Sequence, residues 1–322
     1  MPSRILVTGS SGFIGSALTS ALAAAGHTLR AASRQPMVER QENVEWAHLP
    51  DLESEIDWSS LVAGMDIVVH LAAIAHRGRD DSSDYERANR IATAELAKAC
   101  RRQTIKRLVF MSSIGAQAGS AADDVVTEDC KPRPVTAYDR AKFAAEEEIR
   151  LSGVPFTILR PVIVYGPGAK ANIALIMRIA ALPVPLPFAA FKNRRSLLSI
   201  DNLMQAILLC LDSSATLNGT FIVCDREPIT MAEMLATLRE AGGHSPRLFS
   251  IPPDAVKAII VAAGHRQLWD RIGRELVASS DKLQAAGWSP KIETRAGLRA
   301  MVKRLSGDSV CSLGHCELQE VN

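Results

Sequence analysis

The chain has 322 residues, of which 47% are hydrophobic and 22% are charged, and its formal net charge is +2. This length and composition are typical of an ordinary globular protein with one large core or two unequal ones, and the balanced charge gives no reason to propose a nucleic-acid partner. The longest apolar run, residues 179–191, contains three prolines and is too short to cross a bilayer, so we expect no membrane partner.

The first strand is predicted at Arg4–Val7, which leaves no room for a signal peptide, and we therefore expect a cytoplasmic protein. The six cysteines include no C-x-x-C pair, so a disulfide framework is not expected. Cys311, His315 and Cys316 lie close together in the sequence, but a fourth ligand is missing. We expect no metal site.

A glycine-rich motif follows the first strand. It reads TGSSGFIG over Thr8–Gly15 and precedes a helix predicted from the alanine and leucine content of residues 16–25. Glycines at 9, 12 and 15 let the backbone turn sharply, let a pyrophosphate approach, and let the helix pack against the strand. The motif predicts a dinucleotide site, whereas an ordinary turn is the alternative for glycines considered alone.

The second strand, predicted from Thr28, ends at Ser33 and Arg34. Proteins of this fold that prefer NAD usually carry an acidic residue here, which binds the ribose 2′-hydroxyl. Ser33 can instead hydrogen-bond a 2′-phosphate and Arg34 can pair with its charge, so the sequence favours NADP(H). NAD(H) with Arg34 as a solvated surface cation is the alternative.

Two further apolar strands are predicted at 66–73 and 107–113, with small residues at their carboxyl ends. Ligands bind at this edge of an open α/β sheet, so Ala72, Ala73, Ser112 and Ser113 are expected to line the cofactor crevice. For Ser113, local capping of the turn is the alternative.

Tyr138 and Lys142 are four residues apart in a run of good helix formers, so both should project from one helix face. A nearby ammonium favours the tyrosinate form, which allows Tyr138 to exchange a proton with an alcohol or ketone. Considered alone, the pair is more typical of a packed aromatic residue and a surface cation than of a catalytic pair. Its position after the serine strand favours the catalytic interpretation.

Together these motifs resemble the extended short-chain dehydrogenases, in the NAD-dependent epimerase/dehydratase family. The resemblance rests on the glycine motif, the His70–Ala73 strand end, Asn89, Ser113, the Tyr138/Lys142 pair and the segment LRPVIVYGPG at 159–168. It covers about residues 3 to 304, and the chain is most similar to UDP-glucose 4-epimerases and related nucleotide-sugar 4-ketoreductases. An NAD(P)-dependent enzyme acting on a nucleotide-sugar C4 alcohol or ketone is implied, and a homodimer is one expected state.

The resemblance also implies a set of site residues. The catalytic residues would be Ser113, Tyr138 and Lys142, supported by Asn89. The cofactor contacts would be Gly9, Ser11, Gly12, Phe13, Ile14, Gly15, Ser33, Arg34, Asp51, Leu52, Leu71, Ala72, Ala73, Tyr138 and Lys142. Ser113, Asn172 and Arg195 would bind the substrate, with Arg195 on the diphosphate and Arg194 as its rival. A solvated basic loop is the alternative for both arginines.

Four departures from the family pattern affect the predicted reaction. Ser33 replaces the usual acid, Ala92 replaces a common glycine, Asp139 follows the tyrosine where a small residue is usual, and 113–119 lacks a Tyr-Gly ending. An epimerase keeps its cofactor, while a reductase exchanges NADP+ for NADPH, so the basic strand end favours a reductase without excluding an epimerase. A reductase of a steroid-like or flavonoid-like ketone, and a catalytically silent NADP(H)-binding sensor or assembly subunit, stay as alternatives.

The predicted fold is α/β, a Rossmann-type doubly wound parallel sheet with a smaller C-terminal α/β substrate lobe. We expect the dinucleotide-binding domain at 1–168, with additional elements from about 192–226, and the substrate lobe at 169–191 and 227–304. Helices are expected at 201–211 and 231–241, capped by Asp201 and Thr230. Residues 305–322 are expected to form a polar tail.

Overall fold

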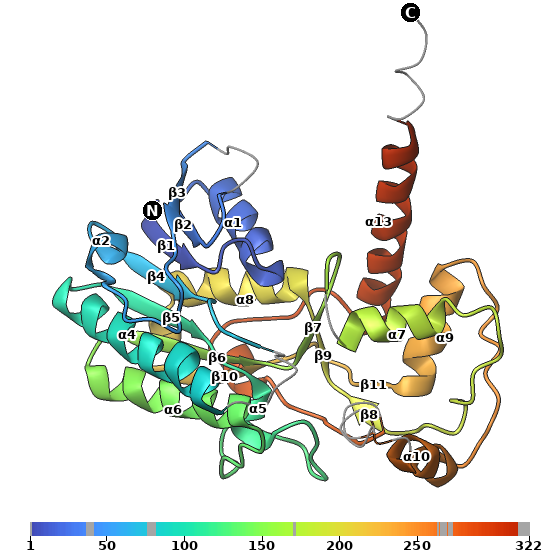
Figure 1. Cartoon of the computed structure of the whole chain (residues 1–322). Helices are drawn as coiled ribbons and strands as arrows, with labels where there is room; N and C mark the ends of the chain where they lie inside the picture. Colours follow the sequence, from blue (N-terminus) through green and yellow to red (C-terminus); the bar gives the residue numbers. More distant parts are fainter. Residues whose placement is uncertain are drawn as a thin grey trace, which may run out of the picture.

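The computed structural model of the chain describes residues 2–36, 42–75, 82–169, 172–262, 264, 269 and 273–314. Its main feature is a seven-stranded sheet with the order β10-β6-β5-β4-β1-β2-β3, in which every neighbouring pair is parallel (Figure 1). The strands are β1 (Arg4–Thr8), β2 (Thr28–Ser33), β3 (Val44–His48), β4 (Ile67–His70), β5 (Arg107–Met111), β6 (Phe156–Pro161) and β10 (Gly219–Val223). The predicted doubly wound fold is confirmed.

Helices cover both faces of this sheet because successive strand residues point to opposite sides. In β1, Ile5 and Val7 join a core with α1 (Phe13–Ala24) and α8 (Ile200–Asp212). Leu6 points the other way, into a core with α4 (Ala92–Arg102) and α6 (Ala137–Ser152). Short elements precede α4 and α6, namely α2 (Ser59–Val62), α3 (Ser82–Tyr85), the π-helix η1 (Glu86–Ile91) and α5 (Ile114–Ala118).

A third core holds the smaller lobe together, around Tyr165, Phe191 and Trp269. Its elements include two small sheets and several helices, seen on the right of Figure 1. They are β7 (Ile163–Tyr165), α7 (Asn172–Ala180), β8 (Arg194–Arg195), β9 (Leu197–Ser199), β11 (Ile229–Thr230), α9 (Met231–Ala241), α10 (Pro253–Ala262) and α13 (Thr294–Gly314). The 3-10 turn η2 (Ser214–Thr216) and α12 (Asp281–Ala285) contact β10 of the large sheet instead. Part of the expected lobe packs elsewhere, since Leu276, Leu283 and Trp288 join the α1/α8 core.

The two helix caps predicted after residue 168 have different outcomes. Thr230 caps α9 as expected, in a reciprocal box with Glu233. The prediction of Asp201 as a cap was wrong, because Ser199 holds that position and its Oγ accepts from the Asp201 backbone N–H at 3.3 Å.

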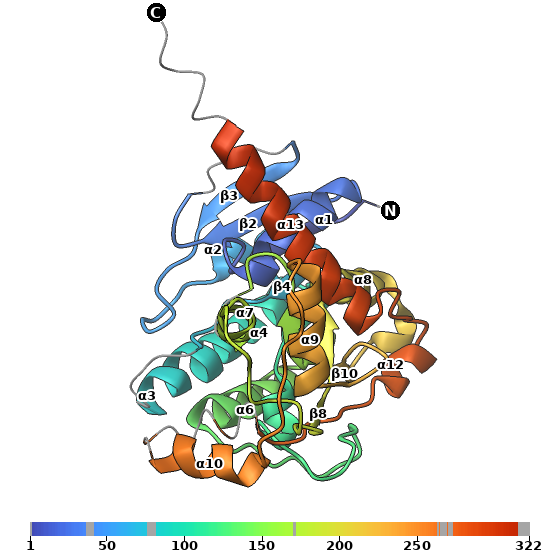
Figure 2. The same cartoon turned by 90° about the vertical axis from the view of Figure 1, so that its right-hand side faces the viewer.

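Helix α13 packs against α9 and its later turns extend away from the rest of the chain (Figure 2). Within the described residues no helix is long and apolar enough to span a membrane, and His, Cys, Asp and Glu side chains form no group of three that could hold a metal. The metal candidates His315 and Cys316 lie outside the described residues, as does the side chain of Cys311.

Candidate active site

The glycine motif forms a tight loop between β1 and α1. Gly9 has φ +75°, and a Cβ at this position would lie 2.9 Å from the backbone N of Ala72. A Cβ at Gly15 would lie 2.1 Å from the carbonyl oxygen of Gly9. Both positions therefore require glycine, for a left-handed turn and for close helix packing.

Some polar groups of this loop have no partner among the described residues, although the backbone N–H groups of Gly9, Ser10 and Gly12 are bonded within the protein. Gly12 begins α1 without a side-chain cap, which leaves helix N–H groups available to an anion. The hydroxyl of Ser10 is buried and, among the described residues, has no hydrogen-bond partner. Unpaired buried polar groups are costly. The loop therefore fits a polar, anionic group such as a dinucleotide, as the sequence suggested.

At the end of β2, the structure gives Ser33 and Arg34 different roles. The buried Ser33 hydroxyl donates to the carbonyl of Gln35 at 2.5 Å and accepts from Trp46 Nε1 at 3.0 Å. Its proton is thus engaged within the protein. Arg34 is exposed and has no ion pair or hydrogen bond in the described part of the chain, so its guanidinium is available to a phosphate.

The remaining cofactor candidates lie along the same edge of the sheet. Leu52 is buried in the α4/α6 core, while Asp51 is exposed and its carboxylate accepts from the Glu53 backbone at 3.2 Å. After β4, Ala72 is buried and its neighbours Leu71 and Ala73 are partly exposed. These positions leave a small-residue strand end beside the glycine loop.

His70 is fully buried beneath this strand end and was not among the predicted site residues. Its Nδ1 lies 2.7 Å from Thr8 Oγ1 and its Nε2 lies 3.1 Å from Thr93 Oγ1. Thr93 donates its hydroxyl proton to the carbonyl of Asn89, so the network is complete with a proton on Nε2. Burial lowers the pKa of His70 to about 3, which keeps the ring neutral.

Asn89 lies in η1 and is buried. Its side-chain amide donates to the carbonyl of Ile74 at 2.8 Å, and its oxygen accepts from the Ile74 backbone N–H at 2.8 Å. Asn89 therefore holds the loop that follows Ala72 and Ala73 by a two-point contact. The Asn89 side chain therefore supports this loop through the Ile74 backbone.

Ser113 follows β5 and caps α5. Its Oγ accepts from the Gly115 backbone N–H at 3.0 Å, so the hydroxyl proton stays available to a ligand. The capping and ligand-binding interpretations of this serine are thus compatible.

Helix α6 carries Tyr138 and Lys142. Lys142 is 2% exposed, and its Nζ donates to the carbonyl of Met111 at 2.8 Å. Burial lowers its pKa to about 7. Tyr138 packs against Tyr85 with ring centroids 6.0 Å apart, and burial together with the Asp139 carboxylate raises the pKa of its phenol. Lys142 thus lies at the end of β5 and Ser113 at the start of α5, while Tyr138 lies one turn before Lys142 on α6.

One turn further along α6, Glu146 forms a buried ion pair with Arg160. The sequence did not predict this pair. Glu146 Oε2 lies 2.5 Å from Arg160 Nη2, and Glu146 Oε1 accepts from Ser112 Oγ at 2.6 Å. Arg160 also donates to the side chain of Gln117 in α5. Glu146 follows Lys142 by four residues, and this spacing indicates that both side chains lie on one face of the helix.

The two arginines of β8 differ in their surroundings. Arg195 is 3% exposed, and it donates to the carbonyls of Arg274 at 2.8 Å and Ser120 at 3.1 Å. Its Nε is buried without a partner, and within the described residues no carboxylate pairs with it. Burial lowers its pKa to about 10. Arg194 is half-exposed and forms an ion pair with Glu275 at 2.8 Å.

Asn172 is the first residue of α7 and is partly buried. Lys170 and Ala171, which belong to the same predicted substrate segment, lie outside the described residues.

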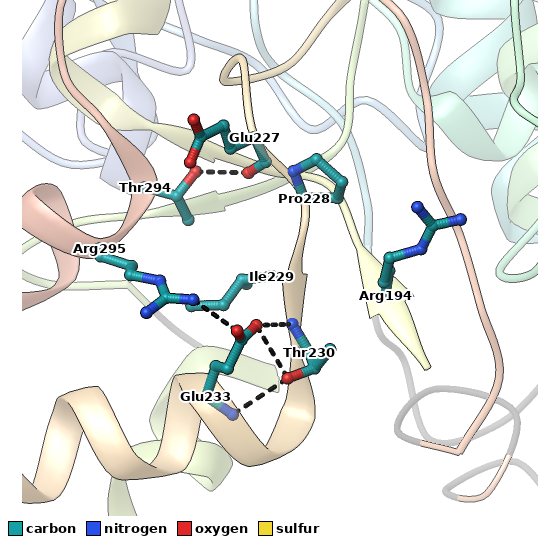
Figure 3. A pocket seen from close by; sticks show the side chains of 8 residues that line it. All are labelled: Arg194, Glu227, Pro228, Ile229, Thr230, Glu233, Thr294 and Arg295. Atoms are coloured by element: carbon teal, nitrogen blue, oxygen red, sulfur yellow. Dashed lines mark hydrogen bonds and ion pairs between the residues drawn. The ribbon is translucent and has the colours of Figure 1, made fainter. Parts of the chain in front are cut away.

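A surface pocket on the smaller lobe contains none of the predicted catalytic residues (Figure 3). Glu233 and Arg295 form an ion pair across it at 2.5 Å, and Thr230 hydrogen-bonds Glu233. Arg194 lies at its edge and points away from Arg295. The polar groups of this pocket are largely paired with one another, unlike Ser10 and Arg195.

Comparison with known proteins gives consistent results. The model of the NAD dependent epimerase/dehydratase family matches residues 5–224. A UDP-glucose 4-epimerase of Vibrio cholerae is 30% identical over 311 residues, or 93% of this chain and 94% of the relative. A 3-diazoavenalumate denitrifying reductase of Streptomyces sp is 30% identical over 309 residues, or 89% and 96%. The solved structure of MoeE5 in complex with UDP-glucose and NAD is 25% identical, with a TM-score of 0.75 over 95% of this chain and 99% of that one.

Proposed function

The chain belongs to the NAD dependent epimerase/dehydratase family, and we propose that it is an NAD(P)-dependent oxidoreductase acting on the C4 alcohol or ketone of a nucleotide sugar. The reaction would be that of a 4-ketoreductase or a 4-epimerase. The observation that carries this proposal is the buried guanidinium of Arg195, which pairs with no carboxylate among the described residues.

A buried cation without a carboxylate partner is costly unless a ligand supplies the opposite charge. Within the part of the chain that the structure describes, the Arg195 guanidinium uses two of its donors, on backbone carbonyls, and its Nε has no acceptor. One of those carbonyls belongs to Ser120, in the loop that follows α5 and hence Ser113. A diphosphate at Arg195 would therefore lie on the side of the lobe that adjoins the proposed catalytic residues.

The relatives support this substrate class. The Vibrio cholerae relative is named for UDP-glucose, and the MoeE5 structure contains UDP-glucose with NAD. A reductase of a non-nucleotide substrate is the second candidate, because the Streptomyces relative is equally similar at 30% identity and is named as a reductase of diazoavenalumate.

In the proposed chemistry, Tyr138 moves a proton and Ser113 orients the reacting oxygen. Ser113 donates its free hydroxyl proton to that oxygen. In the reducing direction Tyr138 donates its phenol proton to a carbonyl oxygen, and in the oxidising direction its tyrosinate accepts the proton of an alcohol. The nicotinamide, when bound, supplies or accepts the hydride. Lys142 stabilises the tyrosinate when it is charged.

The glycine loop, Arg34 and Lys142 would hold the cofactor, with NADP(H) preferred over NAD(H). The support for this preference is the exposed Arg34 at the end of β2, which has no ion pair among the described residues, and the serine that stands at that strand end in place of a carboxylate. The engaged Ser33 hydroxyl contributes less than the sequence suggested, since its proton is already donated to Gln35. NAD(H) is the alternative, and MoeE5 contains NAD.

The substrate assignment can be tested by titrating UDP against three proteins. Arg195→Ala should weaken UDP binding by about 10-fold to 100-fold, the equivalent of losing one charge-assisted hydrogen-bonding group. Arg194→Ala is the matched control, because it removes a neighbouring surface arginine paired with Glu275, and it should change the affinity little. Equal UDP affinities for the Arg195→Ala protein and the wild type would contradict the proposed site.

The alternative cofactor and the alternative functions can be tested with the same purified protein. Mass spectrometry of copurified nucleotides would identify a bound nucleotide sugar and distinguish NAD from NADP. A wild-type protein that binds NADP(H) but not UDP or any UDP-sugar would favour the reductase of a non-nucleotide ketone. A protein that binds cofactor but turns over no ketone would favour the silent sensor or assembly subunit.

A further inference from the structure

Asp139 is a buried acid directly after Tyr138. It is 7% exposed. Its Oδ2 accepts from the Thr136 backbone N–H at 2.9 Å, and its own N–H donates to Thr136 Oγ1 at 3.1 Å, which closes a capping box at the start of α6. Among the described residues, Oδ1 receives no hydrogen bond.

The free oxygen of Asp139 lies beside Ser113. A Cβ built on Gly115 would lie 1.9 Å from Asp139 Oδ1 and 3.3 Å from Ser113 Oγ. Only a glycine at 115 therefore leaves room for this carboxylate. The helix cap requires one carboxylate oxygen, whereas the second lies at Gly115, next to the serine that would hold the substrate oxygen.

Three titratable residues lie near Tyr138 in the described part of the chain. Tyr85 of α3 contacts its ring edge-on, Lys142 lies one turn along α6, and Asp139 is adjacent. The Lys142 ammonium is directed to the Met111 carbonyl, with the Glu146 carboxylate one turn further along the helix. Burial first and Asp139 second raise the pKa of Tyr138. A second anion beside this carboxylate is unfavourable in a poorly solvated site.

We propose that Asp139 is a positioning residue that holds Tyr138 as a protonated phenol and thereby favours ketone reduction over alcohol oxidation. Reduction begins with the phenol, whereas oxidation begins with the tyrosinate, which Asp139 disfavours. An epimerase must perform both half-reactions on one carbon, so this acid favours the reductase. The effect of Asp139 on the reaction rests on the proposed function, but the ionisation of Tyr138 can be measured without substrate.

The test is a spectrophotometric pH titration of tyrosinate in the full chain with excess NADP+. The chain has only three tyrosines, so subtracting the titration of Tyr138→Phe isolates Tyr138. In Asp139→Asn, which keeps an acceptor for the Thr136 N–H but removes the charge, the midpoint should fall by about one pH unit. In Asp139→Ala the midpoint should also fall, and this variant replaces Asp139→Asn in the test if the asparagine variant fails to fold.

Two controls separate charge from helix capping. Thr136→Ala breaks the same capping box but keeps the Asp139 charge, and Glu233→Gln alters the equivalent box of α9 in the smaller lobe. Neither should move the midpoint. A Tyr138 midpoint that is equal in the wild type, Asp139→Asn and Asp139→Ala would overturn the proposal, as would an equal fall in Thr136→Ala. If the wild type does not bind UDP, the proposed substrate is overturned, but the tyrosinate titration still tests the role of Asp139.

Discussion

Lys142 and Met111 are joined by a hydrogen bond of 2.8 Å from the Lys142 ammonium to the Met111 carbonyl. Met111 is the last residue of β5, and Ser112 and Ser113 follow it. This contact ties the helix that carries Tyr138 to the end of the strand that precedes Ser113. Because burial lowers the Lys142 pKa to about 7, its charge at neutral pH depends on nearby anions.

Lys142→Met should lower turnover and weaken cofactor binding together, since the ammonium serves both the tyrosinate and the nicotinamide ribose in the proposed site. Fluorescence titration with NADPH, alongside turnover of any accepted substrate, checks both effects. Lys98→Met, on the exposed side of α4, is the control and should bind normally. Unchanged NADPH affinity in Lys142→Met would remove the lysine from the cofactor site.

Glu146→Gln should lower the free energy of unfolding by about 3–5 kcal/mol, because it leaves the buried Arg160 without its counter-charge. The neighbouring Glu147 is half-exposed and pairs with Arg150 on the surface, so Glu147→Gln should cost at most about 1 kcal/mol. Urea denaturation of both variants measures the difference. A similar cost for the two would mean that the Glu146–Arg160 pair contributes no more than a surface pair.

Arg34→Ala should weaken NADPH binding by about 1–3 kcal/mol and leave NADH binding nearly unchanged, because only NADPH carries the 2′-phosphate. The two cofactors, titrated against the same variant, provide the comparison and the control. An equal loss for both would contradict the 2′-phosphate assignment, and so would purification with stoichiometric, non-exchanging NAD+.

His70 should make the protein less stable as the pH falls below about 6.5. Its pKa is lowered to about 3 in the folded protein from the ordinary value of 6.5, so between these values the unfolded chain binds a proton that the folded chain does not. The His70 contribution to unfolding free energy should decrease by about 1.4 kcal/mol per pH unit in that window. Urea denaturation at several pH values should show a shallower dependence for His70→Gln, but not for the exposed His244→Gln.

The local parts of the site could be predicted from the sequence, whereas the long-range contacts could not. The glycine motif specifies its own turn, and the Tyr138/Lys142 spacing specifies one helix face, because both depend on neighbouring residues. The partners of Ser33 and Glu146 depend on the packing of separate elements: Trp46 reaches Ser33 from β3, and Arg160 reaches Glu146 from β6. Nothing near Arg195 in the sequence indicates that its guanidinium is buried on the carbonyls of Ser120 and Arg274.

The proton transfer itself is tested by Tyr138→Phe, which keeps the ring packed on Tyr85 and removes only the hydroxyl. Folding and cofactor binding should stay intact, while turnover should fall by about 10²-fold or more, the usual scale for loss of a positioned general acid or base. Because Tyr138 has a raised pKa in the protein, alcohol oxidation should increase with pH until the tyrosinate forms, and the phenylalanine variant should lose this dependence. Tyr85→Phe is the matched control, since it removes a hydroxyl from the neighbouring ring, and it should keep most of the activity. Full activity of Tyr138→Phe on a substrate that the wild type converts would refute the assigned mechanism.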